Sequence, residues 1–224
     1  MALTLVIGNK NYSSWSLRAW IALKASGIAF EERLIPLSEP DFKQRVLGLS
    51  PSGKVPVLID EDLHVWESIA ILEYLAERFP EAQLWPAEGR ARAHARSIAA
   101  EVHAGFAALR RECPMNMWRP VRARSLSADA AADVARIDAI WTDCRQRFGG
   151  GGPFLFGRFS AADAMYVPVV SRFATYDIRV GAASRAYMEA VMALPAYAEW
   201  QDAAIREPWV LPDDEPDWPT VLKA

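Results

Sequence analysis

Segments with strand character are confined to the first 66 residues of this chain, and the rest of it has helical periodicity. The strand-like runs are residues 3–7, 29–35, 55–59 and 63–66. Helical patterns follow the first and the last of these runs, and they end at Gly27 and before Pro80. The turn Asp60-Glu61-Asp62 between the third and fourth runs predicts a β-hairpin. This order, βαβ followed by ββα, predicts an α/β domain over residues 1–80.

Helical stripes dominate the second half of the chain. A helix beginning near Ser160, with Asp163 spaced as in a capping box, is apolar nearly all round and is predicted to be the central buried helix. Residues 81–89 are expected to be a linker, and residues 90–224 an all-helical domain. The acidic, proline-rich tail from Pro212 to Pro219 is expected to be irregular.

Composition excludes several classes of protein. Hydrophobic residues make up 52% and charged residues 24%, which is typical of a folded protein. The net charge of −3 gives no footprint for nucleic acid or an anionic membrane, and no apolar run reaches the roughly 18 residues of a membrane span. Cys113 and Cys144 match neither a disulfide framework nor a zinc pattern, and the three dispersed histidines suggest no metal site. Without a signal-peptide pattern, we expect a cytoplasmic protein.

Three local motifs resemble one family. They are Asn11-Tyr12-Ser13-Ser14-Trp15-Ser16-Leu17-Arg18, Ser50-Pro51-Ser52-Gly53-Lys54-Val55-Pro56-Val57-Leu58 and Glu67-Ser68-Ile69-Ala70-Ile71-Leu72-Glu73-Tyr74-Leu75. Together they resemble the glutathione transferases, and most closely the serine-dependent zeta, tau and theta classes. The resemblance covers the whole chain in order and length. It implies a thioredoxin-like domain followed by an α-helical bundle, with glutathione as co-substrate and no metal.

The second and third motifs carry the expected glutathione contacts. A proline inside a strand is tolerated at a sheet edge or after a cis bond. The resemblance implies a cis Val55–Pro56 bond, with the Val55 backbone pairing with the cysteinyl unit of glutathione. It also implies that Glu67 holds the amino group and Ser68 the γ-glutamyl carboxylate at a helix start, although Ser68 alone reads as an N-cap. Lys54 matches a lysine used against the glycyl carboxylate, or is a surface residue.

Ser13 is the expected catalytic residue. Aligning the pattern Ser-x-x-Ser-x-Arg with serine-type transferases places Ser13 on the active hydroxyl, which leaves Ser16 as the N-cap of the first helix and Arg18 as a structural residue. Tyr12 and Ser14 are the local rivals. Lowering a cysteine-like pKa of about 8.5 by about 1.5 units needs about 2 kcal/mol. One hydrogen bond to the charged sulfur supplies roughly that amount.

The second substrate is expected to be a small hydrophobic electrophile bound between the domains. Trp15, Met115 and Trp118 are candidates to line its pocket, or are core residues. Trp15 stands where zeta-type isomerases carry cysteine, which argues against maleylacetoacetate isomerase activity and against thiol exchange. The resemblance implies a homodimer. A glutathione-dependent isomerase or dehalogenase remains an alternative, as does a non-catalytic protein that keeps only the fold.

Overall fold

The computed structural model describes residues 3–215 of the chain. Four strands form one sheet in the order β2-β1-β3-β4. They are β1 Leu3–Ile7, β2 Phe30–Leu34, β3 Val57–Asp60 and β4 Leu63–Trp66. β1 is parallel to β2 and antiparallel to β3, and β3 and β4 form the hairpin predicted at residues 60–62. All four predicted strands are present, with ends shifted by no more than two residues.

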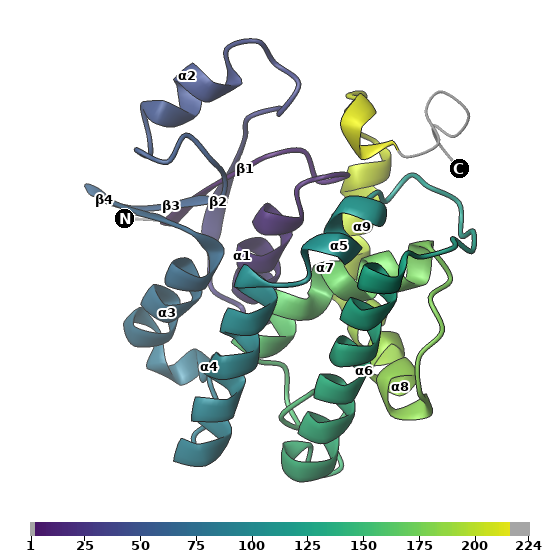
Figure 1. The fold of residues 1–224 in the computed structure, drawn as a ribbon. Helices are drawn as coiled ribbons and strands as arrows, with labels where there is room; N and C mark the ends of the chain where they lie inside the picture. Colours follow the sequence, from purple (N-terminus) through teal and green to yellow (C-terminus); the bar gives the residue numbers. More distant parts are fainter. Residues whose placement is uncertain (1–2, 216–224) are drawn as a thin grey trace.

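The alternation of side chains along the strands divides the sheet between two cores of unequal size. Leu5 and Ile7 of β1 face the main core, which they share with helices α1 (Ser14–Ala25) and α3 (Ser68–Arg78). Val6 and Val57 face the opposite side, where they pack with helix α2 (Phe42–Leu47). In Figure 1, α2 lies across the sheet from α1 and α3. This is the thioredoxin-like arrangement that the resemblance implied.

The remaining helices form a bundle against α1. They are α4 Gly89–Ala104, α5 Ala107–Glu112, α6 Ala128–Phe148, α7 Ala161–Thr175, α8 Ala182–Met192 and α9 Pro195–Ile205. Helix α7 is central, as predicted: every residue from 161 to 173 is buried, and the helix contacts α1, α4 and α8. Its N-terminus carries the predicted capping box between Ser160 and Asp163. Short 3₁₀ turns occur at Pro80–Ala82 and Pro212–Asp214.

Two local predictions need correction. The N-cap of α1 is Ser13 and not Ser16, because Ser13 Oγ accepts a hydrogen bond from the Ser16 N–H. Ser16 Oγ instead accepts from the Gly8 N–H at 3.1 Å, which ties the helix to the end of β1. The tail is not wholly irregular, because Pro212–Asp214 forms a 3₁₀ turn. The predicted tail residues 216–219 lie outside the described residues.

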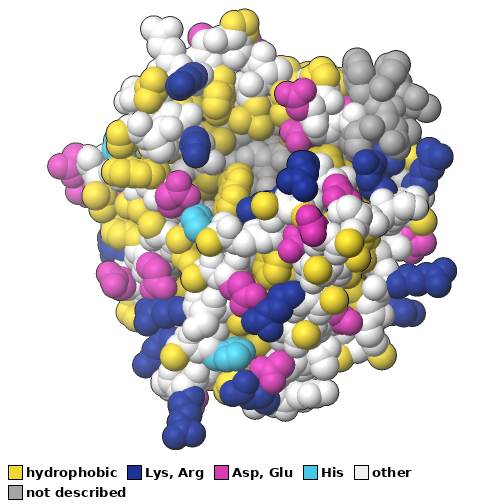
Figure 2. Space-filling model, viewed as in Figure 1, with side chains coloured by type: hydrophobic (Ala, Val, Ile, Leu, Met, Phe, Trp, Pro, Cys, Tyr) yellow, Lys and Arg dark blue, Asp and Glu magenta, His cyan; other side chains and the backbone are white. Residues whose placement is uncertain are grey.

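The surface carries charges of both signs. Figure 2 shows Lys and Arg side chains interspersed with Asp and Glu over this face, with hydrophobic side chains between them. Over the described range, no helix combines the length and the hydropathy that a membrane crossing requires.

Candidate functional site

Two adjoining cavities lie where the sheet domain meets the helical bundle. The smaller has a volume of about 210 Å³. Its lining consists of Trp15, His103 and residues of the second and third motifs, namely Ser52, Lys54, Val55, Pro56, Glu67 and Ser68. The larger, of about 420 Å³, places Tyr12, Ser13 and Ser14 opposite residues of the helical domain. Trp15, Lys54 and Val55 line both cavities. The structure therefore brings all three motifs together.

The smaller cavity is shaped by unusual backbone. The Val55–Pro56 peptide bond is cis, as the resemblance implied. Glu67, the residue before α3, has φ 68° and ψ 122°. Ser68 is the first residue of the helix and is buried, and its Oγ lies 3.9 Å from Met165 Sδ. The N-cap residue, Glu67, makes no side-chain capping hydrogen bond, so the start of α3 at the cavity keeps N–H groups without a capping side chain.

Ser13 lines the larger cavity at the start of α1. Its hydroxyl donates to Ser16 Oγ at 2.7 Å, and its oxygen accepts from the Ser16 N–H at 3.4 Å. Ser14, its neighbour, accepts a hydrogen bond from Arg172 Nη2 at 3.2 Å. The rival Tyr12 donates its hydroxyl to Glu215 Oε1 at 2.8 Å. Burial and this hydrogen bond raise the pKa of the Tyr12 phenol, which keeps it neutral.

His103 is a site residue that the sequence reasoning missed. It comes from α4, lines the smaller cavity, and places Nε2 3.5 Å from Glu67 Oε2. Its ring also packs edge-to-face against Trp15, with centroids 5.2 Å apart. Burial and then the charge of Arg18 lower the pKa of His103, while Glu67 opposes the shift. No local motif marked His103, because only the tertiary fold carries it from the second domain to Glu67.

Of the three residues expected to hold the electrophile, two line the larger cavity and one does not. Met115 and Trp15 line the larger cavity. Trp118 lines neither cavity: it is buried, donates its indole N–H to the Ala204 carbonyl at 2.8 Å, and packs edge-to-face on Tyr12. The prediction for Trp118 is therefore corrected to a core residue behind the site. Arg110 and Arg172, which the sequence reasoning did not select, line the cavity instead.

The loop that precedes Ser13 is fastened to the helical domain. The carboxylate of Glu207, just after α9, accepts hydrogen bonds from the N–H groups of Lys10 at 2.7 Å and Asn11 at 3.0 Å. Trp200 Nε1 donates to the Lys10 carbonyl at 2.9 Å. Asn11 Oδ1 in turn accepts from the N–H groups of Met117 and Trp118. The position of the Ser13 loop therefore depends on residues nearly 200 positions away.

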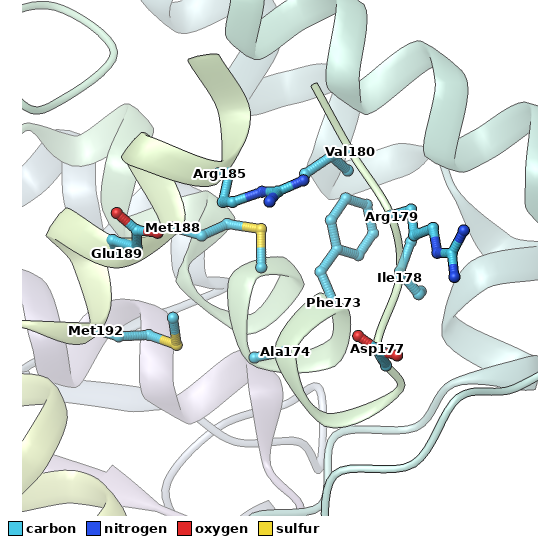
Figure 3. Close-up of a pocket in the computed structure, with 10 residues that line it drawn as sticks. All are labelled: Phe173, Ala174, Asp177, Ile178, Arg179, Val180, Arg185, Met188, Glu189 and Met192. Atoms are coloured by element: carbon cyan, nitrogen blue, oxygen red, sulfur yellow. The ribbon is translucent and has the colours of Figure 1, made fainter. Parts of the chain in front are cut away.

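A third cavity, of about 620 Å³, lies away from these two, between α7 and α8. Figure 3 shows residues that line it, among them the apolar Phe173, Met188 and Met192 and the cationic Arg179 and Arg185. It contains no residue of the three motifs, so its size does not make it the functional site. Within residues 3–215, no group of three or more His, Cys, Asp or Glu residues is placed to hold a metal ion.

The thioredoxin-like sheet, the cis-proline loop and the helical bundle define a two-domain protein with its site between the domains. The family profile described as "Glutathione S-transferase, N-terminal domain" matches residues 12–78, and "Glutathione S-transferase, C-terminal domain" matches residues 121–203. The chain belongs to the glutathione S-transferase family.

The chain is similar to proteins of two kinds. A "Probable maleylacetoacetate isomerase" of Vibrio cholerae is 27% identical over 92% of this chain and 94% of that protein. A protein of the same name from Caenorhabditis elegans is 35% identical, over 42% of this chain and 44% of that one. A crystal structure of a glutathione transferase homologue from Burkholderia, with bound glutathione, has a TM-score of 0.69 at 23% identity over 91% of this chain and 98% of that one.

Proposed function

We propose that this protein is a glutathione transferase, which joins the glutathione thiolate to a small electrophile with a hydrophobic body. The observation that carries the proposal is the convergence of the three motifs on two adjoining cavities. The smaller cavity suits the tripeptide, with the Val55 backbone for its cysteinyl unit. Glu67 and Ser68 are assigned to its γ-glutamyl end, and Lys54 to the glycyl carboxylate. The larger cavity suits the electrophile, against Trp15 and Met115.

Ser13 is assigned as the residue that favours the thiolate. Its hydroxyl hydrogen can turn from Ser16 Oγ toward a sulfur while its oxygen keeps the N-cap hydrogen bond. A hydrogen bond to an ionised sulfur is worth about 1.5–3 kcal/mol, and the N-terminus of α1 adds up to about 1 kcal/mol. Lowering the thiol pKa by about 1.5 units requires about 2 kcal/mol. The serine and the helix together are sufficient, and the hydroxyl never has to act as a base.

The test compares three serine variants on 1-chloro-2,4-dinitrobenzene. Ser13→Ala is expected to lower kcat by about tenfold or more, with a small change in the Kd for glutathione, because one hydrogen bond to the thiolate is lost. Ser68→Ala is expected chiefly to weaken glutathione binding. Ultraviolet absorbance of the bound thiolate gives a second readout of its pKa. A rate loss and a raised thiol pKa in Ser14→Ala, with Ser13→Ala unaffected, would assign the role to Ser14.

A glutathione-dependent isomerase is the second candidate. The full-length similarity to the Vibrio cholerae protein favours it, whereas Trp15 stands where zeta-type isomerases carry cysteine. In such a reaction the thiolate adds to a double bond, the new single bond rotates, and the thiolate leaves again. Catalytic conversion of maleylacetoacetate, with glutathione recovered unchanged, would establish this activity; conjugates that accumulate with other electrophiles would support the transferase.

We further propose a cytoplasmic homodimer. Both cysteines are free and buried, as suits a reducing compartment. The family resemblance motivates the dimer. A dimer of this 24.9 kDa chain has a mass of about 50 kDa, which light scattering coupled to size exclusion separates from the monomer; a monomer at micromolar concentration would contradict the proposal.

A further inference from the structure

Three arginines from separate helices meet beside the larger cavity. Arg18 of α1 stacks on the Trp15 ring at 4.1 Å, and Arg110 of α5 lies 5.5 Å from the same ring. Arg172 of α7 contacts Ser14. Arg18 and Arg172 are almost fully buried, while Arg110 is half-buried and, with Arg172, lines the cavity. Positive charge is therefore concentrated around Trp15, at the wall shared by the two cavities.

The hydrogen bonds of these guanidinium groups go to neutral acceptors. Arg172 donates to the carbonyls of Cys113 and Pro168 and to Ser14 Oγ. Arg110 uses Nη1 for the Val102 carbonyl, which leaves its other nitrogens available at the cavity. Arg18 Nε and Nη1 are buried and have no hydrogen-bond partner within residues 3–215. In that same range, no carboxylate lies within ion-pair distance of any of the three arginines.

Such a cluster lowers the free energy of unfolding, which favours a functional over a structural role for it. Burial lowers the pKa of Arg172 to about 10, and the charge of Arg110 adds to the shift. Burial lowers the pKa of Arg18 well below its ordinary value, with contributions from Arg172 and Arg110. Arginine still keeps its proton at neutral pH, so these charges repel one another. Asp133 near Arg110 and Asp214 near Arg172 offset only part of the positive charge. Buried charges are normally paired, and exceptions concentrate at functional sites.

We propose that the electrophile of this enzyme carries a carboxylate, which binds Arg110 at the cavity surface with the charge of Arg172 behind it. This inference rests on the proposed transferase function and refines its substrate class. The apolar surfaces of Trp15, Met115 and Phe42 hold the hydrophobic body, so the substrate is amphipathic. The guanidinium of Arg110 binds a carboxylate through planar paired hydrogen bonds, and its open nitrogens are available for that geometry.

The carboxylate would fix the reacting carbon near the thiolate. With an aryl halide, the sulfur forms a bond to the ring carbon that bears chlorine, and chloride then leaves with the electrons of the broken C–Cl bond. The thiol proton passes to solvent, and no oxidant or reductant is required. The arginines take no part in bond making, so Arg110 is a specificity-determining residue and Ser13 remains the residue at the sulfur.

The test uses two substrates of similar shape, one of which carries a negative charge. 4-Chloro-3-nitrobenzoate and 4-chloro-3-nitrobenzamide share the reacting carbon and nearly the same shape. The kcat/KM of each, divided by its uncatalysed rate with glutathione, gives an acid-to-amide preference. The wild-type enzyme is expected to prefer the acid by about tenfold or more, and Arg110→Gln is expected to abolish that preference. Arg110→Lys is expected to keep part of it, since it retains the charge without the planar fork.

Arg111→Gln is the matched control, because Arg111 is exposed on the same helix and lines neither cavity. It is expected to keep the acid preference. Calorimetric binding of the two conjugation products supplies a readout that does not depend on turnover, and the acid product is expected to lose affinity selectively in Arg110→Gln. Two outcomes would overturn the inference. In the first, the wild-type enzyme has the same normalised kcat/KM for the acid and the amide. In the second, Arg110→Gln lowers kcat/KM equally for both substrates and raises the KM for glutathione.

These outcomes are separable from failure of the proposed function. Turnover of 1-chloro-2,4-dinitrobenzene with a Ser13-dependent thiolate, but no acid preference, refutes the anionic electrophile and leaves the transferase standing. A raised thiol pKa in Arg110→Gln with an unchanged acid-to-amide ratio likewise refutes it, because the cations would then serve the sulfur. Absence of glutathione binding by the wild-type protein refutes both proposals.

Discussion

Among the residues that the structure describes, Asp214 is the one acidic residue that lines the larger cavity. Burial raises its pKa from the ordinary value of 3.8 to about 6; Arg172 opposes the shift, and Asp213 and Glu215 add to it. Above about pH 6 the carboxylate is ionised and repels an acidic substrate. Below that pH it becomes neutral, while Arg110 and Arg172 keep their charges. The ionisation of Asp214 therefore changes the net charge of the cavity wall just below neutral pH.

The acid-to-amide preference is therefore expected to rise by a few-fold as the pH falls from about 7.5 to about 5.5, since 4-chloro-3-nitrobenzoate remains ionised in that range. Asp214→Asn should show the high preference already at neutral pH. His103, whose pKa is lowered by burial and by the charge of Arg18, faces Glu67 in the smaller cavity and remains in the variant. A pH profile of the preference that is unchanged by Asp214→Asn would refute the role of this carboxyl.

Helix α7 shows how one buried element positions the site. It carries Arg172 into the larger cavity and Met165 against Ser68, and it packs along α1, which begins at Ser13. Its N-terminus is fixed by the buried carboxyl of Asp163, which accepts from Ser160 N–H, Ser160 Oγ and Leu155 N–H. Burial raises the pKa of Asp163 to about 6, against the effect of these hydrogen bonds, so the group is mostly ionised at neutral pH.

Asp163→Ala is expected to lower the free energy of unfolding by about 3 kcal/mol at neutral pH, because it leaves buried donors unsatisfied and removes half of the capping box. For a chain of this size that corresponds to a fall in Tm of about 6–12 °C, measured by circular dichroism. Asp129→Ala is the control: this exposed acid in the first turn of α6 makes only a helix-dipole contribution of up to about 1 kcal/mol. Equal effects of the two substitutions would contradict the importance of the buried capping box.

The sequence was informative wherever local patterns decide structure. Strand-like runs, Gly27 and Pro80, and the Ser160–Asp163 spacing predicted the elements, because each acts over a few residues. The Ser13/Ser16 cap was assigned wrongly, since both serines suit the position and their hydrogen bonds decide between them. The division into residues 1–80, 81–89 and 90–224 stays a prediction.

Apart from Met115, the residues selected from the sequence that line the two cavities all belong to the sheet domain. Two short motifs supply most of the lining of the smaller cavity, namely Lys54, Val55, Pro56, Glu67 and Ser68. His103, Arg110 and Arg172 come from three helices, and nothing near them in sequence indicates that their side chains line the two adjoining cavities. Trp118 was misplaced for the converse reason: its position in the chain is close to Met115, but its indole points toward Ala204. Convergence of this kind is a property of tertiary packing.

At the scale of the whole molecule, Glu207 joins the end of the helical bundle to the loop before Ser13. Glu207→Ala leaves the N–H groups of Lys10 and Asn11 without their acceptor, which is expected to lower stability by about 1–3 kcal/mol. We also expect faster hydrogen exchange at these two amides and a lower kcat, because Ser13 would be held less firmly. The control is Glu199→Ala, which removes only the exposed ion pair with Lys24 and should change stability by less than about 1 kcal/mol. Matching exchange rates in the two variants would contradict the role of Glu207.

The hydrogen bonds of Glu207 with the N–H groups of Lys10 and Asn11 also have a consequence during synthesis. A nascent chain that has emerged only as far as the sheet contains Ser13, Val55 and Glu67, yet lacks the acceptor that fixes the backbone of Lys10 and Asn11. Its first half can therefore collapse on the ribosome long before Ser13 is positioned to stabilise a thiolate. Transferase activity should appear late and abruptly, once α9 and the residues just after it have been translated and have packed against the loop before Ser13.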